Sequence, residues 1–294
     1  EKIASPSEWS EEGLNGSDYA GPYKENVKKT FIRLAEKGLK THFVEKLSKG
    51  SFLVKKASVR RPLVRTLGNE SFYDYSNNSF IEPEGLQFIP LEVVFRFGMP
   101  SGSSLKDRLD KNYAKILGFS EIPRAQKRFE FPIIECFTKL EKTDRFLTTS
   151  EAFTISALPF DVYESLISHS ICLAYWLKNA FLKSGLELWD GKFEWAYDWR
   201  SKELCLVDSI GMDELRLIEP ISGLQLSKEF LRGYYRSTLW YENVKTEKAK
   251  LALDPSFDWK QEVLKKAGQP PLLDKAYRNV ADVLYPTVTW LVTH

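Results

Sequence analysis

The amino-acid sequence predicts an α+β fold. Segments with strand character crowd the first two-thirds of the 294 residues, and segments with helical spacing fill the last third. Proteins that segregate strands and helices in this way belong to the α+β class, whereas α/β folds alternate the two along the chain. The stretch over residues 66–88 is rich in Asn and Ser and has little periodicity, so we expect an insertion near a boundary. We therefore predict an N-terminal lobe over 1–88 and a C-terminal lobe over 89–294.

The chain begins with an irregular stretch, a helix and a pair of strands. Residues 1–22 are rich in Ser, Gly, Glu and Pro without a clear period, which is typical of loop. Apolar residues then recur at helical spacing over 23–39. Segments 41–47 and 52–59 predict two strands joined by a turn at 49–51.

The middle of the chain predicts the main sheet. Segments 89–97 and 128–141 are rich in β-branched and aromatic residues, which favours strands. The best helical pattern in the sequence covers 159–184. Segments 186–198 and 202–208 then read as a β-hairpin with a short turn between them.

Three helices are expected to close the chain, over 227–243, 257–267 and 273–291. Gly268 and two prolines separate the last two. There is no glycine fingerprint for dinucleotides and no Walker-type loop, so the sequence does not predict the folds that those motifs mark.

The hairpin carries the most informative pattern. On a strand, Asp190, Lys192 and Glu194 share one face, while aromatic residues take the other face: Trp189, Phe193 and Trp195. The turn places Asp208 roughly opposite Lys192, so two or three carboxylates surround one lysine. Two carboxylates at that range suit Mg²⁺, which also takes phosphate oxygens and water. The alternative is an ordinary solvated strand face with a stabilising Lys–Glu pair.

A second pattern follows the strand over 89–97. Arg96 near the end of that strand, followed by a Gly- and Ser-rich loop with Ser103 and Ser104, is typical of an anion pocket. Lys106 and Arg108 add positive potential. A flexible surface turn is the alternative.

Two further groups of charged residues follow the hairpin. Asp213 and Arg216 come shortly after a strand, where loops often carry functional groups. Lys228 and Arg232 lie four residues apart on one face of a predicted helix. A polar turn and a solvated helix face are the alternatives.

Composition excludes several classes of protein. The formal net charge is only +2, which argues against nucleic acid or membrane as a partner. Three scattered cysteines do not form a disulfide framework, so we expect a reducing, cytoplasmic compartment. The most apolar run, near residues 166–182, is interrupted by polar residues and predicts a buried helix rather than a membrane span. The oligomeric state is open, with a homo-oligomer among the possibilities.

Six motifs, in this order, resemble the SAICAR synthetase family of purine biosynthesis over about residues 24–245. They are GLKTHF (38–43), PLEVVFR (90–96), Gly102–Ser103, the set Asp190, Lys192 and Glu194, the set Asp208, Asp213 and Arg216, and the helix start from Lys228 to Arg232. The resemblance implies a two-lobed fold with antiparallel sheets, flanking helices and ATP in the cleft between the lobes. It also implies an ATP-dependent ligase that activates the carboxylate of the imidazole nucleotide CAIR as an acyl phosphate. The amine of L-aspartate then attacks, giving SAICAR, ADP and phosphate.

The same resemblance implies roles for individual residues. Glu194 and Asp208 would bind Mg²⁺ and the phosphates of ATP, and Lys192 would contact the carboxylate that is activated. The ribose phosphate of CAIR would lie against Arg96, Ser103 or Ser104, and Arg216, with Asp190, Lys228 and Arg232 in the same substrate-binding set. Asp213 would face the amine side of the imidazole. Lys55, Lys56 and Glu92 would lie on the nucleoside side of ATP.

The sequence departs from the family pattern at three places. The glycine-containing strand pair with lysines that usually opens the family, and the Asp-Arg-x-Ser-x-Phe-Asp segment after it, are not found. The interval from Arg96 to the Gly-Ser pair is one residue longer than usual, and Ser209 and Met212 stand where the family often has Glu and Pro. Two alternatives follow: a relative that forms a similar amide on another carboxylated azole nucleotide, or a catalytically silent relative that keeps the fold.

Overall fold

A six-stranded antiparallel sheet forms the centre of the computed structural model, which describes residues 38–48, 51–76, 85–100, 102–252, 254 and 257–293. Its strand order is β10-β8-β5-β6-β7, and β9 pairs with the other end of β8. The two long central strands are β5 (Leu86–Gly98) and β8 (Glu187–Asp198), and they pair along most of their length. The flanking strands are β6 (Arg128–Thr138), β7 (Phe146–Leu147), β9 (Glu203–Val207) and β10 (Leu215–Ile218).

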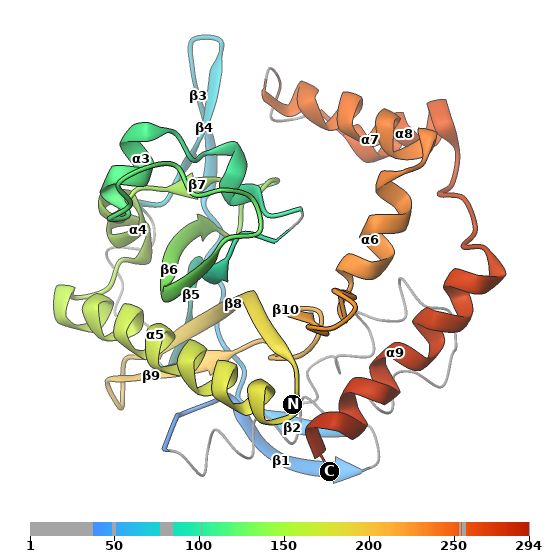
Figure 1. Cartoon of the computed structure of the whole chain (residues 1–294). Helices are drawn as coiled ribbons and strands as arrows, with labels where there is room; N and C mark the ends of the chain where they lie inside the picture. The colour runs from blue at the N-terminus through green and yellow to red at the C-terminus, as the bar shows by residue number, and fades with distance from the viewer. Residues whose placement is uncertain are drawn as a thin grey trace.

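Two separate hairpins precede this sheet. The first joins β1 (Phe43–Ser48) to β2 (Ser51–Val54), and the second joins β3 (Leu63–Leu67) to β4 (Glu70–Asp74). The second hairpin projects from the rest of the chain (Figure 1). Its base is fixed to the body, because Tyr75 Oη donates to Glu141 (3.1 Å) and Tyr73 Oη accepts from the Lys142 amide (3.0 Å).

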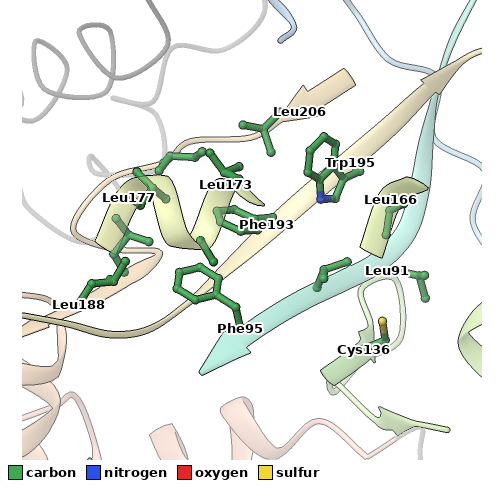
Figure 2. Close-up of a cluster of buried hydrophobic side chains, with 14 of the residues drawn as sticks. Leu91, Phe95, Cys136, Leu166, Leu173, Leu177, Leu188, Phe193, Trp195 and Leu206 are labelled. Atoms are coloured by element: carbon green, nitrogen blue, oxygen red, sulfur yellow. The ribbon is translucent and has the colours of Figure 1, made fainter. Parts of the chain in front are cut away.

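One face of the sheet packs against the long helix α5 (Phe160–Lys183), and this contact forms the core (Figure 2). The period of the strands turns Phe95, Phe193 and Trp195 toward the helix, where they are almost fully buried. Trp195 Nε1 also donates to Ser170 Oγ (3.1 Å), so its polar atom is satisfied inside the core. This packing leaves the opposite face of β5 and β8, with its charged residues, available for chemistry.

Smaller helices surround the sheet. A 3₁₀ turn, η2 (Ser104–Asp107), and the short helix α3 (Lys111–Ile116) follow β5, and α4 (Thr149–Ser156) precedes α5. Helices α6 (Glu229–Arg236), α7 (Leu239–Ala249), α8 (Trp259–Ala267) and α9 (Lys275–Thr293) follow β10, with the 3₁₀ turn η3 (Lys250–Ala252) after α7. They lie together on the side of β10 away from α4 (Figure 1). Among the described helices, none is long and apolar enough to cross a membrane.

Most predicted elements are confirmed, including the strands of the hairpins, the long helix and both long central strands. The stretch over 66–88, expected to be an insertion, begins with part of a hairpin that was not predicted, because β3 and β4 pair there around Gly68. Gly68 has a φ of 62°, as a tight hairpin turn requires. The single helix predicted over 227–243 is two helices, because the Thr238 side chain accepts from the Tyr241 amide and starts α7 anew.

The helices α3 and α4, the strands β7 and β10 and the 3₁₀ turns η2 and η3 were not predicted either, and three predictions about the fold remain untested. The expected helix over 23–39 lies outside the described residues except for its last two, and the 1–22 stretch lies wholly outside them. The division into lobes at 88/89 stays a prediction, and β5 runs across that position.

Candidate active site

Three cross-strand pairs between β5 and β8 organise the polar face of the sheet. Glu92 pairs with Glu194, Val94 with Lys192 and Arg96 with Asp190. Because side chains alternate along a strand, every second residue of both strands points to this face. The predicted alignment of Asp190, Lys192 and Glu194 is thereby confirmed, and β5 adds Glu92 and Arg96 beside them.

Lys192 lies between two carboxylates at the centre of this face. Its Nζ is 2.7 Å from Glu92 Oε1 and 3.2 Å from Glu194 Oε1. Burial alone would lower the pKa of Lys192, but Glu194 and Glu92 raise it above its usual value, so the side chain is a fixed cation. A second lysine, Lys139, reaches the same Glu194 oxygen at 2.6 Å. The sequence predicted two or three carboxylates around this lysine; the two in contact with it are Glu194 and Glu92, while Asp190 contacts arginines instead.

Asp208 joins this cluster from the end of β9. The register places Val207 opposite Glu194, one residue from the predicted pairing, and Asp208 follows with a φ of 61°. Its Oδ2 atom is buried and has no hydrogen-bond partner. Burial raises the pKa of Asp208 to about 7, with further contributions from Glu194 and Glu214 and an opposing one from Lys192.

Glu194 and Asp208 are suited to hold a divalent cation. An orphaned buried carboxylate oxygen is costly unless something binds it, and a second carboxylate at its side makes a cation the natural partner. The described residues contain no group of three or more His, Cys, Asp or Glu that could hold a metal alone. Mg²⁺ fits such a pair, since it commonly uses one or two carboxylates and completes its coordination with phosphate and water.

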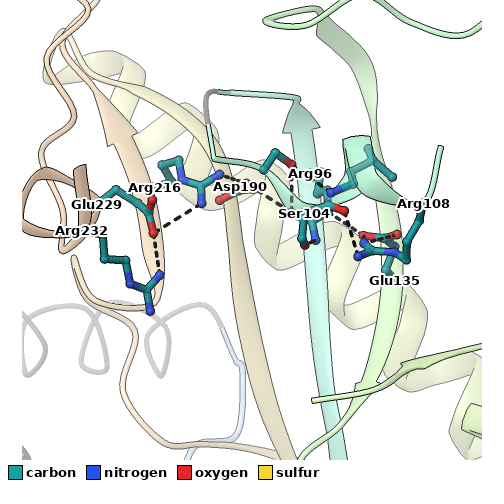
Figure 3. A network of polar contacts seen from close by, with 10 residues as sticks. Arg96, Ser104, Arg108, Glu135, Asp190, Arg216, Glu229 and Arg232 are labelled. Atoms are coloured by element: carbon teal, nitrogen blue, oxygen red, sulfur yellow. Dashed lines mark hydrogen bonds and ion pairs between the residues drawn. The ribbon is translucent and has the colours of Figure 1, made fainter. Parts of the chain in front are cut away.

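Arginines surround the other end of the β5–β8 pair (Figure 3). Arg96 Nε donates to Glu135 Oε2 (2.6 Å), while its Nη1 and Nη2 reach Ser103 Oγ (3.5 Å) and Ser104 Oγ (3.3 Å). Arg96 Nη1 also contacts Asp190 Oδ2 at 3.4 Å. Both candidate serines, Ser103 and Ser104, therefore contact the same guanidinium. The additional residue between Arg96 and the Gly-Ser pair does not move either serine out of reach.

Arg216, on β10, closes the network from the opposite side. Its Nη1 donates to Asp190 Oδ2 (2.7 Å), its Nη2 lies 3.6 Å from Glu229, and its Nε is buried without a partner. Glu229 in turn binds Arg232 and Arg236 from α6, at 2.5 and 2.9 Å. The network contains five guanidinium groups and three carboxylates, so it has two surplus positive charges. The arginines are Arg96, Arg108, Arg216, Arg232 and Arg236, and the acids are Glu135, Asp190 and Glu229. A phosphate monoester carries about that charge with opposite sign near neutral pH.

Asp213 and Lys228 lie near each other and near Glu214. Tyr285, on α9, donates a hydrogen bond to Asp213. Lys228 is half-buried; burial lowers its pKa, Arg232 adds to that effect, and Glu214 and Asp213 oppose it. Both predicted substrate residues are thus part of one charged surface.

Lys55 and Lys56 come directly after β2, and both side chains are exposed. The Lys55 amide donates to the His42 carbonyl (2.7 Å), and its ammonium is close enough to Cys205 to oppose the rise that burial causes in the thiol pKa. Their place on the nucleoside side of ATP stays a prediction.

Sequence reasoning missed five charged or polar residues of the site: Glu135, Lys139, Glu229, Arg236 and Tyr285. Lys139 and Glu135 lie on or next to β6, whose alternation could have indicated a shared face with Glu92. Glu229 is adjacent to the predicted Lys228, but nothing in the sequence indicates that it binds three arginines. Tyr285 comes from α9, far along the chain, and only the fold brings it to Asp213.

Comparisons with known proteins show the family and the fold of the chain. The sequence model of the family described as SAICAR synthetase matches residues 21–247. A protein of Archaeoglobus fulgidus, provisionally named phosphoribosylaminoimidazole-succinocarboxamide synthase, is 34% identical over 271 residues, which are 87% of this chain and 75% of the relative.

Two solved structures share the fold. One is described as a SAICAR synthetase in complex with ADP (TM-score 0.55, 20% identity, 86% of this chain and 83% of that chain). The other is the SAICAR synthase of Saccharomyces cerevisiae in complex with SAICAR (TM-score 0.59, 16% identity, 94% of this chain and 81% of that chain).

Proposed function

The chain belongs to the SAICAR synthetase family, and from this we infer its reaction. It is a carbon–nitrogen ligase that joins aspartate to the carboxylate of CAIR in purine biosynthesis, with ATP consumed to ADP and phosphate. The roles proposed for individual residues rest on the pairing of β5 with β8. A network with two surplus positive charges lies at one end of that pair, and a lysine between carboxylates lies two residues further along β8.

We propose that the ribose phosphate of CAIR binds between Arg96 and Arg216. Both guanidiniums reach Asp190 from opposite sides, and the Ser103 and Ser104 hydroxyls lie beside Arg96. Charge-assisted hydrogen bonds from arginine are the strongest contacts that a protein offers to phosphate. The two surplus positive charges of the network would be neutralised by the bound dianion.

The carboxylate of CAIR then lies near Lys192. An oxygen of that carboxylate attacks the γ-phosphorus of ATP, ADP leaves, and an acyl phosphate forms. The aspartate nitrogen next bonds to the acyl carbon and loses a proton as phosphate departs. Lys192 supplies a fixed positive charge where negative charge develops, and its place between Glu92 and Glu194 keeps it in position without reorganisation.

Glu194 and Asp208 would hold Mg²⁺ next to the phosphates of ATP. When bound, that ion neutralises phosphate charge during the transfer. Lys139 contacts Glu194 and lies 3.9 Å from Glu92, so it adds a second cation on the nucleotide side. The complex of a family structure with ADP supports a nucleotide site in this fold. Asp213, held by Tyr285, would face the amine of the imidazole.

The test is turnover of the protein with CAIR, aspartate, ATP and Mg²⁺, read as SAICAR formation and ADP release. Each of the four components is left out in turn. SAICAR formation that needs all four is the expected result. ADP release without SAICAR would overturn the substrate assignment, and magnesium-independent turnover would overturn the proposed metal site.

A further inference from the structure

The most buried charge near the phosphate end of the site belongs to Glu135 on β6. Its side chain is 0% exposed and accepts from three different residues. Arg96 Nε lies 2.6 Å from one carboxylate oxygen, Arg108 Nη2 lies 2.8 Å from both, and Tyr113 Oη lies 3.1 Å from one. Burial alone would raise the pKa of Glu135, but Arg96 and Arg108 lower it below its usual value, so it stays ionised.

Glu135 binds Arg96 through Nε and leaves its two terminal nitrogens for other partners. With Nε occupied, the two terminal nitrogens of Arg96 point toward Ser103, Ser104 and Asp190. Because Nε is taken, the two terminal nitrogens are the pair that remains for a forked contact with phosphate. A contact at Nε fixes the plane of the guanidinium, and therefore the direction of the fork.

Glu135 also fixes the loop that carries the serines. Arg108, which shares its carboxylate, donates through Nη1 to the Ser104 carbonyl (3.0 Å). Arg108 itself is held between two aromatic rings, 4.9 Å from the centre of Phe137 and 5.1 Å from that of Phe146. One carboxylate thus connects Arg96 on strand β5 to the loop after it, which carries Ser103 and Ser104.

We propose that Glu135 is a positioning residue that aims Arg96 and the Ser103–Ser104 loop at the phosphate of the substrate. This inference rests on the proposed function of the same site. Without the carboxylate, Arg96 and Arg108 become two like charges with no shared counter-ion, and they separate. The donors of the pocket must then become ordered when phosphate binds, and this loss of conformational entropy lowers the affinity for phosphate.

The experiment compares Glu135→Gln with Glu135→Asp and with Glu130→Gln, which removes an exposed carboxylate from the same strand. The KM for CAIR, ATP and aspartate and the kcat are measured for each variant. Glu135→Gln should raise the KM for CAIR by about tenfold or more, because glutamine keeps the shape of the side chain but removes the charge that holds both arginines. The KM for ATP and aspartate should change by less than about twofold, Glu135→Asp should be intermediate, and Glu130→Gln should match the wild type.

A purely structural role predicts a different outcome. It would lower kcat or all three affinities together, along with the unfolding temperature, and that result would overturn the proposal. If Glu135→Gln does not fold, Tyr113→Phe provides the second test, since it removes one hydrogen bond and keeps every charge. Tyr113→Phe should raise the KM for CAIR about two- to fivefold with kcat unchanged, and an unchanged KM would contradict the proposal.

Binding of a simple anion separates this inference from the proposed reaction. Calorimetric titration with inorganic phosphate and with ribose 5-phosphate needs no turnover. Weaker binding of both to Glu135→Gln supports the positioning role, even if the wild type makes no SAICAR. Equal binding to both proteins would overturn the inference while leaving the reaction untouched.

Discussion

Replacement of Asp208 by Asn should make the resting protein more stable and the enzyme inactive. Asp208 is buried beside Glu194, and its Oδ2 has no hydrogen-bond partner. Its negative charge therefore destabilises the folded, metal-free protein. Asn has nearly the same shape, tolerates the positive φ of this position and can donate to Glu194. The change therefore removes repulsion without creating a cavity.

The size of the effect follows from the pKa of Asp208. Folding raises that pKa from 3.8 to about 7, so between these values the folded state binds more protons than the unfolded state. The free energy of unfolding must then fall as pH rises through this window. The penalty reaches at most about 4 kcal/mol at pH 8 and about 2 kcal/mol at pH 5, at 1.36 kcal/mol per pKa unit. Asp208→Asn should recover it, with a larger gain at pH 8 than at pH 5.

The assay is urea unfolding in metal-free buffer with chelator at both pH values, with turnover measured separately in Mg²⁺ and ATP. Glu164→Gln, which removes an exposed carboxylate from α5, controls for the change in net charge. A variant less stable than the wild type at pH 8, or a gain that does not shrink at pH 5, would refute the electrostatic reasoning. Turnover near the wild-type rate would refute the proposed metal role of Asp208.

Three further substitutions test the rest of the site. Lys192→Ala should lower kcat by about 10²–10³-fold, as loss of a preorganised charge at a developing anion does, with circular dichroism showing an intact fold. Arg216→Ala should raise the KM for CAIR by about tenfold or more while the KM for ATP is unchanged; an unchanged KM for CAIR would remove Arg216 from the phosphate pocket. Tyr285→Phe deletes only the hydroxyl that donates to Asp213, so it should raise the KM for CAIR about two- to tenfold, and identical kinetics would show that α9 does not act on the substrate.

Sequence reasoning succeeded where the signal was local. The two-residue period of β8 placed Asp190, Lys192 and Glu194 on one face, and a short turn brought Asp208 to the same region with an error of one residue. Strong apolar patterns likewise located β5 and α5. The β3–β4 hairpin was missed because its strands are mostly exposed and carry little apolar alternation, although the Gly68–Asn69 pair is a known hairpin signal.

Partners that come from distant parts of the chain could not be predicted. Glu92 and Lys192 are 100 positions apart, and Arg96 and Glu135 meet only because β6 pairs with β5. The sequence shows each charged residue but not which residue of opposite charge it pairs with. That pairing decides whether a buried side chain stays ionised or has a strongly shifted pKa. The capping box of α4, Thr148 with Glu151, is by contrast a local signal that would have predicted that helix.

The spacing of side chains along β8 also explains how one face of the sheet can bind both CAIR and ATP in the proposed function. Residues on one face of a strand lie roughly 6.5–7 Å apart, since the rise is about 3.3–3.4 Å per residue. Asp190 lies between Arg96 and Arg216, Lys192 lies one step along and Glu194 one step further, beside Asp208. In the proposed function this order repeats the order of the reacting groups: ribose phosphate, carboxylate, then the metal-bound phosphates of ATP. A rigid central strand therefore fixes the distance between the two substrates, and a one-residue slip of its register would turn all three side chains into the core.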